Sequence, residues 1–302
     1  MEAIALFGPT GVGKTAVAVA LIRALRVRGE DPVAISADAL QVYAGLETLV
    51  GARELGPGAG GEVEHRLQSI VPVTETFSAG EFAALAHREI DAAIAAGRRP
   101  VVVGGTGLYL RAALTELQLR PPPPPGLRER IEAAVADRGV AAMHAELAAK
   151  SPERAAAIEP TDRSRVVRAL ELHEMGALDT GYGDQLWTSD TRVPTRLFGL
   201  VRDREDLYAR IDERVDAMVG AGAADEVRRA DAAGASRTAR AALGFTELLA
   251  GDVDAMKRRT RQYARRQLTW MRKLGGVELI DLTGDDAGTA ARRIAGTVAR
   301  RR

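Results

Sequence analysis

The sequence contains no cysteine among its 302 residues. This absence excludes disulfide bridges, thiolate metal ligands and a cysteine nucleophile, and it fits a reducing compartment. Aromatic residues are scarce, at 4%, so Ala, Val and Leu must build most of the core. No apolar run approaches the length of a bilayer-spanning helix, and the first residues lead directly into a motif without room for a signal peptide. We therefore expect a cytoplasmic protein that does not enter a membrane.

The net charge of +1 hides a local bias. Residues 257–273 include eight basic side chains and no acidic one. Such a segment can attract phosphate or nucleic acid. On its own, it is better interpreted as the solvated face of a helix.

Strands alternate with helices in the amino-terminal third of the chain. Apolar runs at 3–7, 32–36 and 99–103 end in glycine, proline or polar residues, which is typical of buried strands. Segments with helical spacing, 15–28 and 78–96, lie between them. This alternation predicts a P-loop NTPase-like α/β fold, with a parallel sheet flanked by helices.

The composition changes at Pro121–Pro125. Five consecutive prolines cannot continue a helix or a central strand, so they predict a stiff connector. The residues that follow, to about 175, are rich in Arg, Glu and Ala and predict an all-helical insertion over 121–192. The α/β core would then consist of residues 1–120 and 193–302.

The second part of the core is expected to complete the sheet and cover it. Strands are predicted at 195–201 and 277–282. Helices are predicted at 205–220, 224–233, 256–274 and 287–301. No sustained apolar surface stripe demands a dimer, so we expect a monomer.

A phosphate-binding loop follows the first predicted strand. Its residues match the pattern G-x-x-x-x-G-K-[ST] without a gap. Backbone N–H groups and the dipole of the next helix can hold an anion there, a lysine adds a point charge, and a threonine hydroxyl suits Mg²⁺. The loop predicts bound phosphates without identifying the molecule that carries them. It consists of Gly8, Pro9, Thr10, Gly11, Val12, Gly13, Lys14 and Thr15.

Polar residues follow the other two amino-terminal strands. Asp38 and Gln41 come after the second strand, and Thr106 follows the third within a glycine-rich segment. Carboxyl ends of parallel strands share one edge of a sheet, so these side chains should lie near the phosphate loop. Asp38 could accept a proton from a nucleophile or help hold a metal through water. The alternative is an Asp that caps a helix.

At these residues the sequence resembles the tRNA dimethylallyltransferases, also called tRNA isopentenyltransferases. The resemblance covers nearly the whole chain, and its motifs occur in the family's order. They are the phosphate loop, Asp38–Tyr43, His65–Leu67, Gly104–Tyr109, Arg165–Glu171, Leu243–Glu247 and Thr260–Trp270. The last of them is long and specific.

The resemblance implies transfer of a dimethylallyl group from dimethylallyl diphosphate to N6 of the adenosine on the 3′ side of the anticodon. The loop would then hold the leaving diphosphate, and Asp38 would be the general base on the amine. Lys14, Thr15 and Thr106 complete the implied catalytic set. Mg²⁺ is the implied cofactor, held by Thr15, with Asp38 assisting through water.

The implied partner is the tRNA anticodon stem-loop, against which the helical insertion would sit. A basic face adds to this surface, because Arg258, Arg261, Arg265 and Arg272 recur at helical spacing and can contact RNA phosphates. The opposite face, with Tyr263 and Gln267, should pack on the core. The predicted tRNA-binding residues are Asp38, Ala39, Leu40, Gln41, Thr106, Arg128, Ser164, Arg165, Val166, Val167, Arg168, Arg261, Arg265 and Arg272.

Three departures from the family pattern lie close to base recognition. Ala39 stands where the family usually has Ser, residues 49–54 lack the usual Thr and Pro and carry Arg53 for Lys, and 176–190 lacks a Gly-x-Pro-Leu-Ser string. Two other enzymes remain as alternatives. One is an adenylate isopentenyltransferase acting on free AMP, and the other is a small-molecule kinase that uses the loop for ATP. A non-catalytic RNA-binding relative is disfavoured because Asp38, Lys14 and Thr15 are all present.

Overall fold

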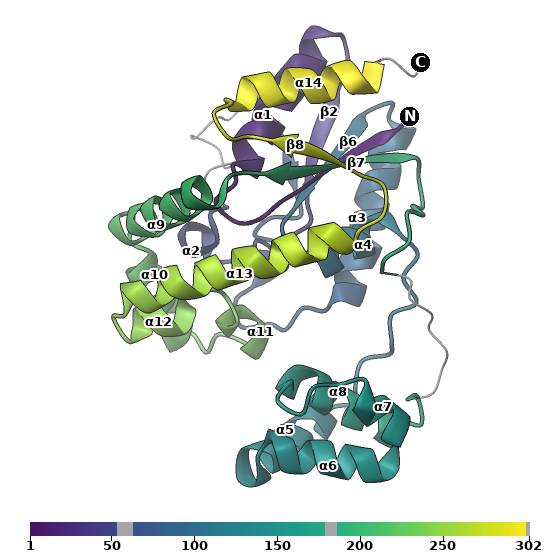
Figure 1. Ribbon diagram of the computed structural model, residues 1–302, viewed down its shortest axis with the longest axis vertical. Helices are drawn as coiled ribbons and strands as arrows, with labels where there is room; N and C mark the ends of the chain where they lie inside the picture. The colour runs from purple at the N-terminus through teal and green to yellow at the C-terminus, as the bar shows by residue number, and fades with distance from the viewer. Residues whose placement is uncertain (53–62, 179–185, 300–302) are drawn as a thin grey trace. The chain divides into compact units, whose positions relative to one another are not determined.

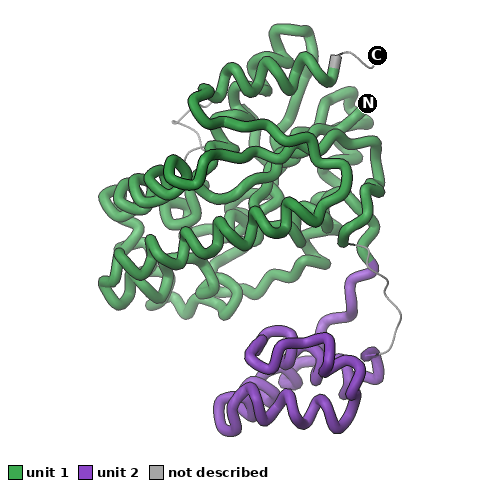
Figure 2. Tube along the Cα trace, viewed as in Figure 1, with its two compact units in different colours: residues 1–117, 185–302 green, residues 118–184 purple. Residues whose placement is uncertain are grey.

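The computed structural model describes residues 1–52, 63–178 and 186–299. The chain forms two compact units, one of residues 1–117 and 185–302 and one of residues 118–184 (Figure 2). We expected the insertion to end at 192, but the residues from 186 onward belong to the first unit. Arg53 and Glu54, which depart from the family pattern, lie outside the described residues, as does part of the 176–190 segment.

A six-stranded parallel sheet forms the centre of the first unit (Figure 1), which confirms the predicted fold class. The strands stand in the order β4-β2-β6-β1-β7-β8. The five predicted strands are all present, and the two-residue β4 is too short to show a pattern in the sequence. The bounds are Ala3–Phe7 for β1, Pro32–Ser36 for β2, His65–Arg66 for β4, Arg99–Gly104 for β6, Thr195–Val201 for β7 and Val277–Asp281 for β8.

The central strand β1 is buried on both faces. It lies between β6 and β7, with Leu6 opposite Val103 on one side and Phe198 on the other. Successive side chains of a strand point to opposite faces, and here Ile4 and Leu6 pack in one core cluster while Ala5 and Phe7 pack in another. A strand buried on both faces must be apolar throughout, which is why this run was recognisable in the sequence.

Helices cover the sheet on both faces (Figure 1). Leu21 of α1 and Ile294 of α14 pack in the cluster that contains Leu6. Phe82 of α3 and Leu110 of α4 pack in the cluster that contains Phe7. The bounds are Lys14–Val27 for α1, Ala79–Ala95 for α3, Gly107–Leu114 for α4 and Ala287–Ala299 for α14.

A further group of helices packs beside the carboxyl edge of the sheet. The long helices α9 and α13 contact one another. α9, α10 and α13 match the predicted helices within a few residues at each end, whereas the short helices α11 and α12 were not predicted. Their bounds are Arg204–Gly220 for α9, Ala223–Ala232 for α10, Arg237–Arg240 for α11, Phe245–Leu249 for α12 and Val253–Lys273 for α13. A short helix, α2 (Glu47–Val50), and a two-stranded parallel sheet of β3 (Tyr43–Ala44) and β5 (Val71–Pro72) complete this unit.

The second unit is helical, as the composition indicated. Its helices are α5 (Leu127–Arg138), α6 (Val140–Lys150), α7 (Pro152–Ala156) and α8 (Arg163–Glu174). Gly139 has a φ of 81° and separates α5 from α6, a conformation that glycine adopts without strain. The apolar sides of all four helices form one cluster, which includes Ile131, Leu147 and Leu170.

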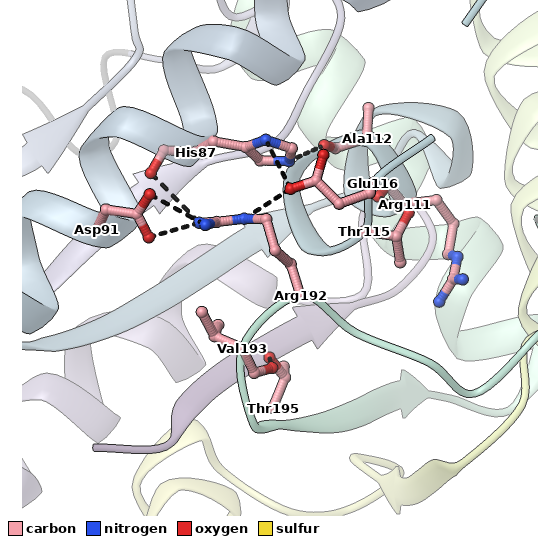
Figure 3. Close-up of polar contacts among 9 residues, drawn as sticks. All are labelled: His87, Asp91, Arg111, Ala112, Thr115, Glu116, Arg192, Val193 and Thr195. Carbon is pink, nitrogen blue, oxygen red and sulfur yellow. Dashed lines mark hydrogen bonds and ion pairs between the residues drawn. The ribbon is translucent and has the colours of Figure 1, made fainter. Parts of the chain in front are cut away.

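The chain leaves the first unit after α4 and returns before β7, and Arg192 joins these two passages (Figure 3). The backbone N–H of Arg192 donates to the carbonyl of Leu114 at 2.7 Å. Its guanidinium donates two hydrogen bonds, of 2.7 and 3.0 Å, to the Asp91 carboxylate on α3 and lies 3.8 Å from Glu116. Both passages are therefore fixed to the same side of α3.

Among the described residues, no helix combines the length and the apolar character needed to cross a bilayer.

Candidate active site

Three loops meet at one edge of the sheet. They follow β1, β2 and β6, which stand side by side in the order β2-β6-β1. All three strands run in the same direction, so their carboxyl ends share this edge. The structure thereby brings together the predicted phosphate loop, Asp38 and Thr106.

The phosphate loop is folded as an anion cradle. Gly11 and Gly13 have φ values of 81° and 105°, which other residues adopt only with strain. The Lys14 Nζ donates to the carbonyls of Gly8 and Pro9, each at 2.9 Å, so the ammonium lies over the loop. Helix α1 begins at Lys14, and its amino-terminal dipole adds positive potential at the same place.

Two of the loop's N–H groups are already bonded within the protein. The Thr10 N–H donates to the Gln267 Oε1 at 2.8 Å, and the Val12 N–H donates to the Pro9 carbonyl at 3.3 Å. The Val12 side chain is fully buried. We therefore expect the anion to be bound through the N–H groups of the later loop residues, Gly13 to Thr15.

Asp38 is held beside the loop by its own backbone. Its Oδ1 accepts the N–H of Leu40 at 3.0 Å, the bond of an Asx turn. Asp38 lines a large cavity and a small one, in both cases together with Lys14 and Thr15. A carboxylate in this position can take a proton from a nucleophile that approaches the phosphate end.

Gln41 lines both cavities, and its amide is also hydrogen-bonded within the protein. We expected its amide to be available to a base edge. Its Oε1 instead accepts from the Ser36 Oγ at 2.9 Å and from the Gln68 Nε2 at 3.2 Å, and its Nε2 lies 3.4 Å from the Val50 carbonyl. Gln41 therefore holds together the segments around Asp38.

The loop after β6 is packed tightly because its glycines have no side chains. A Cβ on Gly104 would lie 2.4 Å from the Ala37 carbonyl oxygen, and one on Gly107 would lie 2.2 Å from the Trp270 ring. Thr106 lies between these two contacts, and its hydroxyl is within hydrogen-bond distance of the Tyr263 hydroxyl. These glycines are required by close approach to the neighbouring segments.

The large cavity has a volume of about 600 Å³ and changes from polar to apolar along its length. Its polar end contains Lys14, Asp38 and Gln267, and its apolar end contains Leu49 and Met256. Gln267 and Met256 are both on α13, and at about 1.5 Å per residue they are separated by about 16 Å along the helix. Met256 and Leu49 are 2% and 3% exposed, so their side chains form part of the buried wall at this end.

The small cavity, of about 20 Å³, has room for a single water molecule. It is lined by Thr15, Asp38 and His65, among others. Burial lowers the pKa of His65 to about 4, so its ring is neutral at physiological pH. The buried His65 Nε2 has no hydrogen-bond partner among the described residues.

The oxygen ligands near the loop fit Mg²⁺ that is bound mainly by substrate. No group of three or more His, Asp and Glu side chains within residues 1–52, 63–178 and 186–299 could hold a metal ion by itself. Mg²⁺ in phosphate sites usually keeps several waters and takes only one or two protein oxygens plus phosphate oxygens. Thr15 and Asp38, which line both cavities, offer such a set.

The basic helix α13 has the two faces predicted for it. Gln267 and Met271 are buried, and Arg265 and Arg272 are exposed. Arg261 differs from this expectation because its guanidinium donates to the Asp212 carboxylate at 2.6 Å. Arg265 and Arg272 are therefore better placed for RNA phosphates than Arg261.

In the helical unit, Arg128 and Arg168 are engaged by one carboxylate. Glu171 is fully buried and accepts hydrogen bonds of 2.8 Å from each arginine. Arg168 also donates to the carbonyls of Arg120 and Pro121, at 3.2 and 2.6 Å. These two arginines stabilise the unit internally, in addition to any contact with RNA.

The amino-terminal turn of α8 divides the other predicted RNA contacts into two groups. Ser164 and Arg165 are exposed. Val166 and Val167 are 0% and 3% exposed, so our prediction that they contact tRNA is wrong for their side chains, which form part of the core. The spacing of the apolar residues on this helix already indicated a buried face.

Sequence reasoning did not single out Arg210 and Arg214, which line the large cavity from α9. The Arg210 Nε donates to the Gly11 carbonyl at 3.2 Å, within the phosphate loop. The two arginines are one helical turn apart, and this spacing was the only available signal. It could not reveal that their helix packs beside the loop.

Known proteins with similar sequences include tRNA-modifying transferases. A family model described as IPP transferase matches residues 41–274. The tRNA dimethylallyltransferase of Symbiobacterium thermophilum is 39% identical over 299 residues, which covers 95% of this chain and 92% of that protein. The tRNA dimethylallyltransferase of Thermobifida fusca is 41% identical over 283 residues, with coverage of 89% and 86%.

Solved structures give the same result for the fold. The tRNA isopentenylpyrophosphate transferase of Bacillus halodurans has a TM-score of 0.70 at 33% identity, covering 99% of this chain and 96% of that one. A eukaryotic dimethylallyltransferase acting on tRNA has a TM-score of 0.72 at 21% identity, covering 100% and 80%, and shares the fold.

Proposed function

The chain belongs to the IPP transferase family, and from this premise we propose that it transfers a dimethylallyl group from dimethylallyl diphosphate to tRNA. The acceptor is N6 of the adenosine on the 3′ side of the anticodon, and diphosphate is released. We further propose that the enzyme works as a monomer in the cytoplasm, where its tRNA substrate is found.

The observation that carries this proposal is the two-sided character of the 600 Å³ cavity. One end offers an anion cradle with Lys14 and Asp38, and the other is lined by Leu49 and Met256. A donor with a diphosphate head and a short branched alkyl tail satisfies both ends at once. ATP would place polar ribose and adenine groups where this cavity is apolar.

In the proposed reaction, the adenine N6 attacks C1 of the dimethylallyl group. The N6–C1 bond forms as the bond between C1 and the diphosphate oxygen breaks, and the N6 proton passes to the Asp38 carboxylate. The leaving diphosphate gains negative charge, which Lys14 and the loop N–H groups stabilise. Thr15 would hold Mg²⁺, which would supply further positive charge for the leaving diphosphate.

The acceptor must come out of its stack to reach this site. An adenine within a stacked anticodon loop is inaccessible, so the base is flipped into the cavity. We propose that exposed residues outside the cavity position the RNA. These are Ser164 and Arg165 on the helical unit and Arg265 and Arg272 on α13.

The two alternatives fit less well. An adenylate isopentenyltransferase would use the same loop and Asp38, but it needs neither the helical unit nor exposed arginines on α13. A kinase would place a polar nucleotide base at the end that Leu49 and Met256 line. Both alternatives would leave the similarity to tRNA-modifying relatives along nearly the whole chain unexplained.

The decisive experiment supplies the purified protein with dimethylallyl diphosphate, Mg²⁺ and either unmodified tRNA or AMP. We expect mass spectrometry to find N6-dimethylallyl-adenosine in the digested tRNA and no prenylated AMP. Prenylation of AMP alone would favour the first alternative. A phosphorylated product formed from ATP, with no use of the prenyl donor, would favour the second.

A further inference from the structure

Gln267 connects two of the loops that build the active site. It is on α13, its side chain is 4% exposed, and it lines the large cavity. Its Oε1 accepts the N–H of Thr10 at 2.8 Å, and its Nε2 donates to the Gly105 carbonyl at 2.6 Å. A single amide group thus bridges the phosphate loop after β1 and the glycine-rich loop after β6.

Helix α13 packs closely against the glycine-rich loop at this bridge. A Cβ on Gly105 would lie 2.6 Å from the Gln267 Nε2 and 3.2 Å from the Lys14 Nζ. One turn further along α13, the Trp270 ring fills the space that a side chain on Gly107 would need. The helix therefore fits closely against this loop at two successive turns, with the amide at the turn nearer to Lys14.

Only a side chain with a donor and an acceptor on one planar group can make both bonds. An apolar side chain of the same length would fill the space but leave the Thr10 N–H and the Gly105 carbonyl without partners. Removing a partner from a buried polar group is costly, and here the cost would fall on the two loops themselves.

The two loops carry different halves of the chemistry in the proposed reaction. The phosphate loop holds the leaving group, and Thr106 next to Gly105 stands on the side of the acceptor base. Catalysis requires the reacting atoms to be held close to their attack geometry, and a misplacement of about 1 Å can cost about a hundredfold in rate. A fixed link between the loops would set this separation.

We propose that Gln267 is a positioning residue that fixes the distance between the diphosphate-binding loop and the acceptor side of the active site. It contacts neither reacting atom and acts through Thr10 and Gly105. This inference rests on the proposed function, because it assigns donor and acceptor to the two loops.

The Gln267→Glu variant tests the bridge through its pH profile. Glutamate keeps the acceptor for the Thr10 N–H, but it faces the Gly105 carbonyl with an oxygen that can donate only when the carboxyl is protonated. Burial and the carbonyl dipole favour the protonated form and raise the pKa of such a carboxyl, whereas the Lys14 ammonium, which also lies against Gly105, favours the ionised form. We expect the ratio of variant to wild-type kcat to be near one at low pH and to fall about tenfold as the carboxyl ionises.

Two further variants separate positioning from general damage. Gln267→Met fills the same space without either hydrogen bond, so its kcat should fall about tenfold at every pH, with KM for tRNA almost unchanged. Gln262→Met is the matched control for Gln267→Met, because Gln262 is exposed on the same helix and the substitution adds no charge, so its kcat should match wild type. Thermal unfolding of each variant confirms that the assay temperature lies below its transition.

Three outcomes would overturn the inference while the wild-type enzyme remains active on tRNA. They are a Gln267→Glu ratio that does not change with pH, a Gln267→Met variant with wild-type kcat, or a loss confined to KM for tRNA. Inactivity of the wild-type protein with dimethylallyl diphosphate and tRNA would count against the proposed function instead. The two failures are therefore distinguishable.

Discussion

The hydroxyl oxygen of Tyr263 lies 3.2 Å from the hydroxyl oxygen of Thr106. Burial and, to a smaller extent, the nearby charge of Asp38 raise the pKa of Tyr263 to about 12. The phenol therefore remains protonated at any pH at which the enzyme would be assayed. It can fix the orientation of the Thr106 hydroxyl.

Tyr263→Phe should release Thr106 without disturbing the phosphate loop. The loss of one hydrogen bond is worth about 1 kcal/mol, so we expect kcat to fall roughly fivefold to tenfold, with KM for dimethylallyl diphosphate unchanged. Steady-state kinetics with each substrate varied in turn measures both values. An unchanged kcat, or a rise confined to KM for the donor, would contradict this role for the pair.

Asp38→Asn should remove the general base while leaving the loop in place. The amide oxygen of Asn still accepts the Leu40 N–H, so the Asx turn is retained. We expect kcat to fall about a hundredfold or more, because the amine loses its proton acceptor, and Asp38→Ala should have no detectable turnover. Equilibrium binding of tRNA, measured by filter retention, should remain close to wild type in both variants.

Near wild-type turnover in either variant would remove Asp38 from the mechanism. Loss of tRNA binding together with turnover would instead indicate that Asp38 serves mainly to hold the acceptor.

The parts of the fold that could be predicted from the sequence are those with a strong local pattern. β1 is apolar throughout and β6 is apolar after Arg99, because both strands are largely buried, and glycine marks the end of each. α13 could be predicted because basic and apolar residues alternate at helical spacing. The two-residue strands β3, β4 and β5 contain no such period, and the pairing of their short backbone segments depends on distant parts of the chain.

The site could be predicted only as far as its motifs extend. The glycines and Lys14 identify a phosphate loop, because an anion cradle needs those residue types in that order. The bond from Thr10 to Gln267 joins residues 257 positions apart, and nothing in either neighbourhood indicates it. Val166 illustrates the opposite case, because its place in a family motif suggested RNA contact, whereas its burial shows a role in the core.

Glu171 is expected to contribute stability that depends on pH. Burial alone would raise its pKa, but hydrogen bonds from Arg128 and Arg168 outweigh this effect and hold the pKa of the carboxyl below its ordinary value. The ionised form is therefore favoured in the folded state. This stabilisation is complete above the ordinary pKa of about 4.3 and is lost as the pH falls through the lower folded value.

Glu171→Gln should therefore lower the melting temperature of the full chain at pH 7. Removal of one partner from a buried ion pair typically costs about 3–5 kcal/mol, because the remaining charges lose their compensation. Calorimetry at pH 7 should show a clear difference from wild type, and the difference should shrink below pH 4. Glu174→Gln is the matched control, because its partner Arg130 is 64% exposed and such pairs are worth at most about 1 kcal/mol. Equal effects of the two substitutions would contradict this assignment.

Hydrogen bonds and an ion pair hold the two passages that connect the α/β unit with the helical unit. Arg192 ties the returning passage to Asp91 on α3 and to the Leu114 carbonyl, where the outgoing passage begins. Close by, the Arg111 Nη2 donates to the Thr188 hydroxyl at 3.1 Å. The chain thus enters and leaves the α/β unit through two adjacent, fixed points (Figure 3).

If the helical unit binds the anticodon stem-loop, Arg192→Ala should weaken tRNA binding more than catalysis. Freeing a single connector residue restores backbone entropy of about 1–2 kcal/mol that RNA binding must then remove again, so we expect KM for tRNA to rise about tenfold. KM for dimethylallyl diphosphate and kcat at saturating tRNA should stay within about twofold, because the catalytic loops are untouched. Asp91→Ala should give a similar shift, and the double variant should be little worse than either single one, because both act through the same contact. A fall in kcat, or equal rises in both KM values, would show that the substitution damages the α/β unit itself. The contact between Arg192 and Asp91 would then have no specific role in tRNA binding.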